Sequence, residues 1–387
     1  MRMPVVRERR VGHGFCKLLS SFCFASSPQM PMQETEDVGN VMSFAAKTAV
    51  LLTMAVSLIL PVSPVAAQDR AQQLTPLRVV LNFQADGALN GFYHAAAKGY
   101  YRDVGLDLTL DHSSGSADAI SRAASGLYDI AVGDIATLTE FTIKNPDTAP
   151  RAVFLLYNRS PQAIIALKKS GIAKPADLQG RVLGIGAADA PSRMFPAFAS
   201  LTKLDLDKIE RRQINPRVRD SMLMGGQVDA VTGFDTTVFF NLKNNGVTYE
   251  DVNIIYYGDH GLDVYGNAIL ASRAALQDKR DLVKKFVAAS ARGWRESIAD
   301  PAGTIVAMRK FNEVAPLDNE IERLKWIGSR IIAPETIRKD GIGAFDADRL
   351  ALNLQQISAA FNLPKTLTVD DIYDPAFLPP LDQRLVK

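Results

Sequence analysis

The sequence predicts an α/β fold built as two lobes. Between Leu77 and Lys387 it repeats one unit: a short apolar strand, a turn rich in Gly, Ser or Asp, and an amphipathic helix. The hydrophobic period changes from about two to about 3.6 residues at each turn, which is typical of strand–helix–strand units over a largely parallel sheet. Two such blocks and a helical tail indicate two doubly wound sheets with a cleft between them.

The first block alternates strands with helices. The ranges that we expect as strands are Leu77–Phe83, Leu106–Asp111, Asp129–Gly133, Arg151–Tyr157 and Gln162–Leu167. The ranges that we expect as helices are Leu89–Tyr101, Ser116–Gly126 and Ile135–Lys144. The last two strands are consecutive, with no helix between them.

The second block follows the same pattern and ends in the helical tail. Its expected strands are Arg181–Gly186, Ile209–Ile214, Val228–Thr232, Val252–Tyr257 and Tyr265–Ala271. Its expected helices are Pro191–Leu201, Val218–Met224 and Thr236–Lys243, and those of the tail are Asp281–Ala299, Pro301–Asn312, Asn319–Ile332 and Asp346–Asn362. Two crossing strands join the blocks, so we assign residues 77–165 and 266–387 to the first lobe and 166–265 to the second.

The residues ahead of these blocks have the features of a secretion signal. Ser43–Lys47 is a weakly basic start, and Thr48–Leu60 is an apolar run shorter than the ~20 residues that span a bilayer. The segment Val65–Ala67 then gives the small-residue pattern that signal peptidase cleaves. We therefore expect Met42 to be the true start, with residues 1–41 as an upstream extension, and cleavage after about Ala67.

Composition narrows the class of protein. Six of the 44 Lys and Arg and four of the 42 Asp and Glu precede Gln68, so 38 of each remain after cleavage. With no net positive charge, the mature chain is not expected to bind nucleic acid or anionic lipid electrostatically. Cys16 and Cys23 are the only cysteines, and both precede the cleavage point. Disulfides, cysteine nucleophiles and thiolate metal sites are therefore excluded from the mature chain.

Several segments resemble bacterial ABC-transporter substrate-binding proteins of the branch that serves nitrate, alkanesulfonates, taurine and thiamine pyrimidine precursors. The stretch Leu81–Leu108, with its aromatic residue, Lys-Gly-Tyr-Tyr and Gly-Leu-Asp-Leu, is similar to the opening of that family. Further matching motifs are Gly115–Ala117, Gly126–Asp134, Ala176–Gly180, Gly226–Ala230 and Phe286–Pro301. The resemblance spans residues 77–365 and implies a two-lobed periplasmic-binding-protein fold of type II. It also implies a monomeric periplasmic protein that closes on a small solute and passes it to an inner-membrane permease.

The end of the first strand departs from one group within that branch. Proteins for pyrimidine precursors usually read Leu-[Asp/Asn]-Trp-x-Pro-Asn-x-x-His there. This chain keeps Asn82 and an aromatic ring at Phe83 but has Ala85, Asp86 and Leu89 where the group has Pro, Asn and His. The importer role depends less on these positions than the identity of the solute does.

Candidate solute contacts lie in the loops that follow strands, where α/β sheets bind small ligands. In the first lobe they are Asn82, Phe83, Asp86, Ser114, Gly115, Ser116 and Asp134. In the second lobe and the return crossing they are Asp189, Ser192, Arg193, Phe234, Asp235, Tyr265 and Asn267. Each lobe thus offers an aromatic ring and a carboxylate, which favours a planar, nitrogen-containing solute over nitrate or a sulfonate. The competing roles for these residues are structural: core Phe, Asp and Ser as turn or helix-cap residues, and a solvated Arg.

No catalytic set is recognisable in the sequence. It contains no Gly-x-Ser-x-Gly, His-Glu-x-x-His, phosphate loop or Gly-x-Gly-x-x-Gly, and His94, His112 and His260 lack metal-ligand spacing. We therefore expect a solute-binding protein with no enzymatic activity, metal or cofactor. A pyrimidine-synthesising enzyme of the same family is an alternative, but that branch carries a cysteine cluster. The sequence is also compatible with a nitrate, sulfonate or taurine carrier and with a sensor that docks on a membrane receptor.

Overall fold

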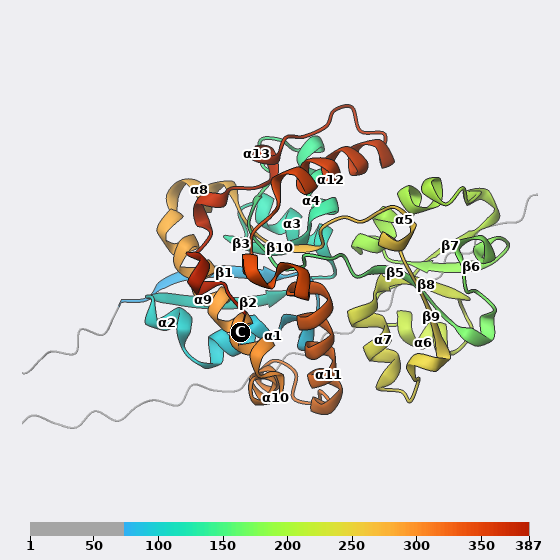
Figure 1. Ribbon diagram of the computed structural model, residues 1–387, viewed down its shortest axis with the longest axis horizontal. Helices are drawn as coiled ribbons and strands as arrows, with labels where there is room; N and C mark the ends of the chain where they lie inside the picture. Colours follow the sequence, from blue (N-terminus) through green and yellow to red (C-terminus); the bar gives the residue numbers. More distant parts are fainter. Residues whose placement is uncertain (1–72, 387) are drawn as a thin grey trace, which may run out of the picture. The chain divides into compact units, whose positions relative to one another are not determined.

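The structure is a computed structural model, and it describes residues 73–386. The predicted start at Met42 and the predicted signal segment up to Ala67 lie outside these residues. Within them the strands form two five-stranded sheets flanked by helices (Figure 1). We call each sheet with its helices a lobe, and the predicted two-sheet α/β fold is confirmed.

The first sheet has the strand order β2-β1-β3-β10-β4. Its strands are β1 (Thr75–Leu81), β2 (Leu106–His112), β3 (Ile130–Asp134), β4 (Arg151–Leu155) and β10 (Asn267–Ala271). β1 runs parallel to β2 and β3, whereas β10 is antiparallel to β3 and β4. The sheet is therefore mixed rather than largely parallel, because β10 enters it from the other lobe and runs against its neighbours.

The second sheet has the strand order β7-β6-β8-β5-β9. Its strands are β5 (Gln162–Leu167), β6 (Val182–Ile185), β7 (Glu210–Gln213), β8 (Ala230–Phe234) and β9 (Val252–Tyr256). The incoming strand β5 is antiparallel to β8 and β9, as β10 is in the first sheet. Because the whole of β5 pairs in the second sheet, the sheets divide the chain before Gln162, earlier than the predicted boundary after residue 165.

Two connections cross between the lobes, and they hydrogen-bond to each other. One joins β4 to β5 and the other joins β9 to β10. The backbone N–H of Gly266 donates to the Tyr157 carbonyl at 3.0 Å, and the Tyr157 N–H donates to the Asn267 carbonyl at 2.8 Å. This paired crossing is where a change in the angle between the lobes would occur.

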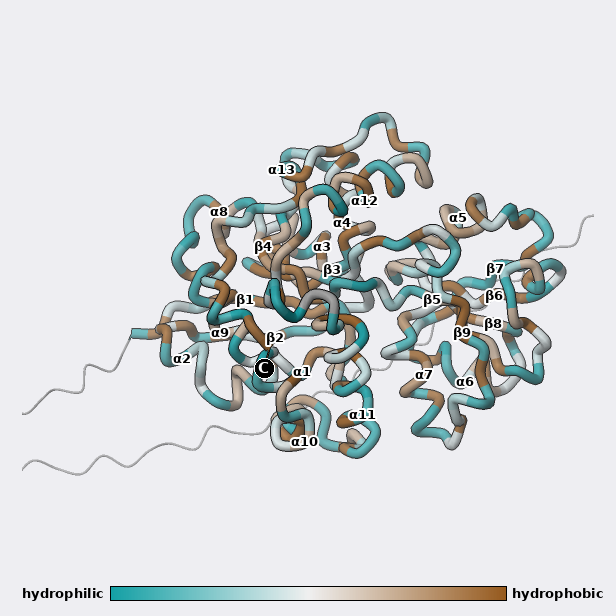
Figure 2. The backbone as a smooth tube through the Cα atoms, in the orientation of Figure 1, coloured by the Kyte–Doolittle hydropathy of each residue, from teal (hydrophilic) through white to brown (hydrophobic). Residues whose placement is uncertain are grey.

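Each sheet is buried on both faces by helices. The first sheet is covered on one face by α1 (Asn90–Ala97), α9 (Arg280–Ala299) and α11 (Leu317–Ile327), and on the other by α3 (Ser116–Ala124), α4 (Ile135–Lys144) and α12 (Ala347–Ala360). The second sheet is covered by α5 (Ala190–Leu201) on one face and by α6 (Arg219–Met224) and α7 (Asp235–Lys243) on the other. Strands such as β5 are accordingly apolar at successive positions, as Figure 2 shows.

Some predicted helices are shorter than expected. The predicted helix Leu89–Tyr101 is divided into α1 and α2 (Tyr100–Asp103), because Gly99 adopts a left-handed conformation with φ 79°. The predicted helix Pro301–Asn312 is α10 (Pro301–Thr304) followed by a 3₁₀ segment. These breaks leave the strand-end loops in the places where the sequence predicts them.

Candidate functional site

Loops from both lobes meet around one narrow cavity, which has about 320 Å³ of space if its opening to solvent is counted but only about 20 Å³ of room for water. The residues that line it are Asn82, Phe83, Gly115, Ser116, Asp189, Ala190, Arg219, Phe234 and Thr237. The first four follow β1 and β2, and the others lie at the start of α5, α6 and α7 or at the end of β8. The cavity therefore lies at the carboxyl ends of parallel strands, the usual ligand position in α/β sheets.

Two phenylalanines, one from each lobe, contribute to the wall of this cavity. Phe83 comes two residues after β1, and Phe234 is the last residue of β8. Both side chains are half-buried, and both line the cavity. Ring faces in a small cavity can stack on a flat solute, which a core phenylalanine cannot do.

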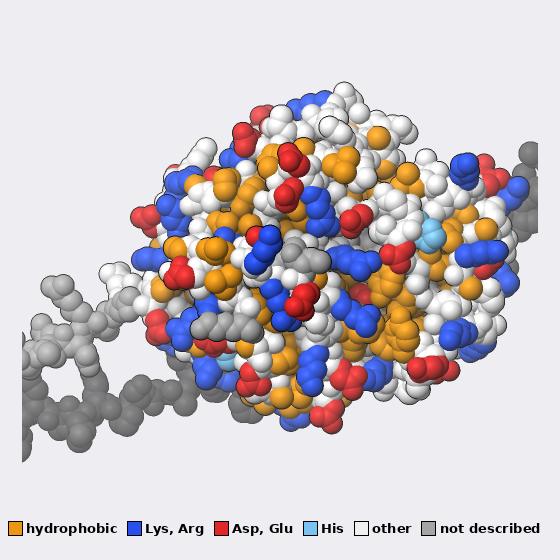
Figure 3. Space-filling model, viewed as in Figure 1, with side chains coloured by type: hydrophobic (Ala, Val, Ile, Leu, Met, Phe, Trp, Pro, Cys, Tyr) orange, Lys and Arg blue, Asp and Glu red, His pale blue; other side chains and the backbone are white. Residues whose placement is uncertain are grey.

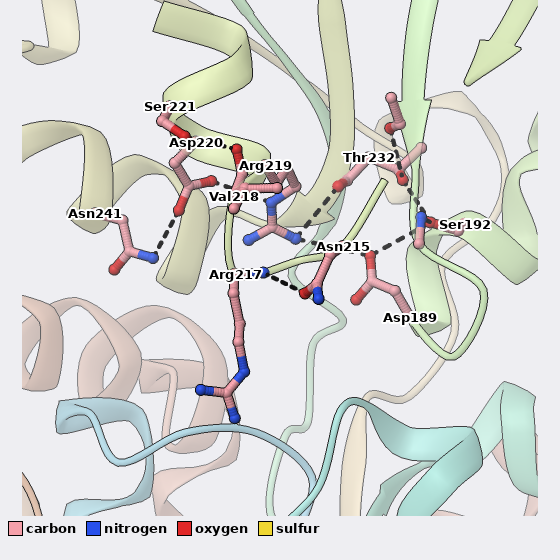
Figure 4. Close-up of polar contacts among 12 residues, drawn as sticks. Asp189, Ser192, Asn215, Arg217, Val218, Arg219, Asp220, Ser221, Thr232 and Asn241 are labelled. Atoms are coloured by element: carbon pink, nitrogen blue, oxygen red, sulfur yellow. Dashed lines mark hydrogen bonds and ion pairs between the residues drawn. The ribbon is translucent and has the colours of Figure 1, made fainter. Parts of the chain in front are cut away.

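Arg219 lines the cavity and carries one unpaired, buried hydrogen-bond donor. The residue is only 3% exposed, and its Nε donates to Asp220 Oδ1 at 3.1 Å (Figure 4). Its Nη1 lies 3.5 Å from the Thr232 carbonyl and 3.8 Å from Asp189 Oδ2. Its Nη2 has no hydrogen-bond acceptor among residues 73–386. A buried donor without an acceptor costs ~1–3 kcal/mol, so a solute that supplies an acceptor there gains affinity.

Asp189 provides the carboxylate of the cavity. Its Oδ2 accepts from the Ser192 hydroxyl at 3.4 Å, and Ser192 Oγ in turn accepts from the Gly186 N–H at 2.8 Å. Burial raises the pKa of Asp189 to about 6, although the nearby Arg219 and the Ser192 hydrogen bond act to lower it. Ser192 thus positions the loop and the carboxylate rather than lining the cavity itself.

The first lobe contributes a small polar network. Ser116 Oγ accepts from Asn82 Nδ2 at 3.4 Å and from the Asp134 N–H at 3.1 Å. The Ser116 O–H itself has no acceptor among the described residues, so it can donate to a solute. Asp134 is fully buried behind this network and does not line the cavity; it caps α4 and accepts from Gln162 Nε2 at 3.0 Å. Burial raises the pKa of Asp134 to about 6.

Several other predicted contacts also lie away from this cavity. Arg193 pairs with the buried Glu140, with 3.1 Å between Nε and Oε2, and so joins α5 to α4. Ser114 is exposed and bonds to Asp118. Asp235 sits at the start of α7, and Asp86 caps a 3₁₀ turn after Phe83.

The two predicted residues of the return crossing have structural partners as well. The Tyr265 hydroxyl accepts from the Asp346 N–H at 3.1 Å, and its ring packs edge-on against Phe345. Asn267 begins β10 opposite Asp134. Neither residue lines the cavity. Three cavity residues, Ala190, Arg219 and Thr237, are not among those predicted from the sequence; their only signal is their place in the first turns of helices that follow strands.

The lobes touch each other on both sides of the cavity. On one side the Ala117 N–H donates to the Ala188 carbonyl at 3.3 Å, and a Cβ on Gly115 would stand 2.4 Å from the Ala188 oxygen. On the other side α11 reaches α7, where Trp326 Nε1 donates to Asp235 Oδ2 at 2.9 Å. The structure therefore has the lobes closed around the cavity.

Basic and acidic side chains are interspersed on the face of the molecule that Figure 3 shows. Within residues 73–386 no group of three or more His, Cys, Asp or Glu is placed to hold a metal ion. No helix in that same range combines the length and the apolar character needed to cross a membrane.

Two α/β lobes, two crossing connections and a cavity at the strand ends define a periplasmic-binding-protein fold. The chain belongs to the NMT1/THI5 like family, whose profile matches residues 88–304. The riboflavin-binding protein RibY of Chloroflexus aurantiacus is 26% identical over 65% of this chain and 72% of its own. The formylaminopyrimidine-binding protein of Halalkalibacterium halodurans is 21% identical over 66% of this chain and 77% of that protein's own length. The resemblance predicted from the sequence is confirmed.

A solved structure supports the same fold. The alkanesulfonate-binding protein SsuA from Xanthomonas axonopodis pv. citri, bound to MOPS, superposes with a TM-score of 0.59. The superposition covers 77% of this chain and 98% of that one, at 15% sequence identity. At this identity the likeness describes the fold and leaves the solute to be argued from the cavity.

Proposed function

We propose that this protein is the solute-binding component of an ABC importer and captures a planar, nitrogen-containing heterocycle between its lobes. The observation that carries the proposal is the pair Phe83 and Phe234, which approach one small cavity from opposite lobes. The solute ring stacks on these side chains, and Arg219 Nη2 donates to a ring nitrogen or carbonyl at its edge. The relatives named for riboflavin and formylaminopyrimidine, both planar heterocycles, support this class of solute.

The charge of the cavity argues against a nitrate- or sulfonate-type solute. Arg219 is the only basic side chain among the lining residues, and it faces two carboxylates, Asp189 and Asp220. A buried cation between two carboxylates has little positive potential left for an anion. A neutral heterocycle with an acceptor on its edge satisfies Arg219 without adding charge.

The remaining parts of the proposal follow from the same role. The two lobes, with β5 counted in the second, close by a hinge at the crossing, and the loaded form docks on an inner-membrane permease. The protein is a periplasmic monomer released by cleavage after about Ala67. In this role the protein binds and releases its solute without bond chemistry. A solute recovered after prolonged incubation should therefore have an unchanged mass.

Solute capture is tested by denaturing the native protein and identifying released molecules by mass spectrometry. A thermal-shift panel of riboflavin, pyrimidines, sulfonates and nitrate complements it, because a ligand of the folded state raises its melting temperature. Phe83→Ala and Phe234→Ala should each weaken binding about 5- to 150-fold, given ~1–3 kcal/mol per stacked ring. Phe141→Ala, a half-buried ring away from the cavity, is the matched control. Undiminished affinity in both cavity variants, or binding of sulfonate alone, would contradict the proposal.

A further inference from the structure

A second cavity adjoins the first and shares one wall with it. It measures about 910 Å³, counting space open to solvent. The residues that line it are Phe83, Gln84, Ala85, Asp86, Asn241, Asn244, Asn312, Val314, Ala315, Pro316, Glu320 and Arg323. Phe83 lines both cavities, so a ring stacked on this side chain has the second cavity beside it.

The second cavity is rich in side-chain amides that retain free hydrogen-bonding groups. Asn244 Oδ1 accepts from Asn319 at 2.5 Å, and Asn312 Nδ2 donates to the Ala85 carbonyl at 3.1 Å. Within residues 73–386 the structure records no partner for Asn244 Nδ2, for Asn312 Oδ1 or for the exposed side-chain amide of Gln84. These side-chain amides therefore offer both hydrogen-bond donors and acceptors to a solute, and all of these groups are uncharged. Hydroxyl groups, which donate and accept, complement such a surface.

The charged groups of this cavity are paired with one another. Arg323 is 1% exposed on its side chain, and its guanidinium contacts Asp86, Glu320 at 3.1 Å and Asn241 Oδ1 at 3.1 Å. Two carboxylates thus surround one cation, and the other polar lining residues are uncharged. A phosphate placed here would meet acidic oxygens, and no residue lining the cavity has a basic group free to pair with it.

We propose that the solute carries a neutral, hydroxylated chain on its planar ring, and that the second cavity binds this chain and rejects its phosphate ester. The proposal rests on the proposed function, because it needs the ring to stack at Phe83. It extends that function by defining the substituent: a bare ring fills only the first cavity, and a polyol chain uses the amides of the second.

The proposal is tested by titrating the purified protein with matched ligands and following binding by calorimetry. One series is lumichrome, riboflavin and riboflavin 5′-phosphate, and the other is cytosine, cytidine and cytidine 5′-monophosphate. In the series that binds, the hydroxylated member should bind about tenfold more tightly than the bare ring, as one or two added hydrogen bonds provide. It should also bind at least tenfold more tightly than the phosphate ester.

Variants at the exposed Gln84 keep the test independent of folding. Gln84→Ala should weaken riboflavin binding several-fold and leave lumichrome binding unchanged, and Gln84→Lys should favour the phosphate ester relative to wild type. Gln277, exposed on α8 (Arg273–Asp278), supplies the control substitutions.

Two results separate this proposal from the proposed function. If the bare ring or the phosphate ester binds as tightly as the hydroxylated ligand, the proposal for the second cavity is wrong and ring stacking stands. If no member of either series binds, both proposals fail.

Discussion

Replacing Asp235 with asparagine should change how the stability of this protein depends on pH. Asp235 is 1% exposed, and its Oδ2 accepts from Tyr256 at 2.8 Å and from Trp326 at 2.9 Å. Its Oδ1 has no donor among the described residues. Burial raises the pKa of this carboxyl from 3.8 to about 6, although both hydrogen bonds act to lower it.

The sign and size of the effect follow from the two pKa values. Since the folded state holds the Asp235 proton more tightly than the unfolded state, ionising the group costs folding free energy as the pH rises from about 4 to about 6. A shift of about two units corresponds to ~3 kcal/mol at 1.36 kcal/mol per unit. Asparagine does not titrate, so the stability of the variant relative to wild type should rise by ~2.4 kcal/mol between pH 4 and pH 7. Any cost of fitting the amide is the same at every pH and cancels.

Urea unfolding of both proteins at half-unit steps from pH 4 to pH 7.5 measures this difference. Asp278→Asn, a change of the same charge at an exposed position, corrects for net charge. Other buried carboxyls titrate in both proteins, so only the difference between the two curves reports on Asp235. A difference that stays constant within ~0.5 kcal/mol across this range would refute the assigned burial and its effect.

Two further substitutions test the cavity. Gly115→Ala places a Cβ 2.4 Å from the Ala188 carbonyl oxygen, at φ 149°, so the lobes must separate locally. Calorimetry should show that the affinity for the solute falls at least about tenfold. An affinity equal to that of the wild type would contradict the closed contact. Arg193→Gln removes a partner of the buried Glu140 and should lower the free energy of unfolding by ~1 kcal/mol. The same variant should keep the solute affinity within twofold of wild type. A larger loss of affinity would indicate that Arg193 contacts the solute.

The sequence predicts the strands and strand ends well because their signals are local. α4 has the predicted bounds Ile135–Lys144, since Asp134 caps it and its apolar residues repeat with the helical period. β5 has the predicted bounds because a run of apolar residues stands between turn signals. The direction of β10 is not local, since it depends on the chain returning from the other lobe. The predicted parallel sheet is mixed for that reason.

The lining of the cavity is predictable only in part. Asn82, Phe83, Ser116 and Phe234 follow from the strand-end rule alone, because parallel strands bring their carboxyl ends together. The same rule also selects Asp134, which the fold uses to cap a helix. Aspartate at the end of a strand is equally suited to a helix cap and to a ligand, and only the direction of its side chain decides between them.

The two arginines of the second lobe show the limit of that reasoning most clearly. Arg193 and Arg219 both stand in the first turn of a helix that follows a strand, so position alone cannot separate them. The helical period turns Arg193 toward α4, where Glu140 binds it. Arg219 instead lies between Asp189 and Asp220, lines the cavity and keeps one buried nitrogen unpaired. The partner that each guanidinium meets comes from an element distant in sequence, and this is why a cation could be predicted for these loops but not assigned to a residue.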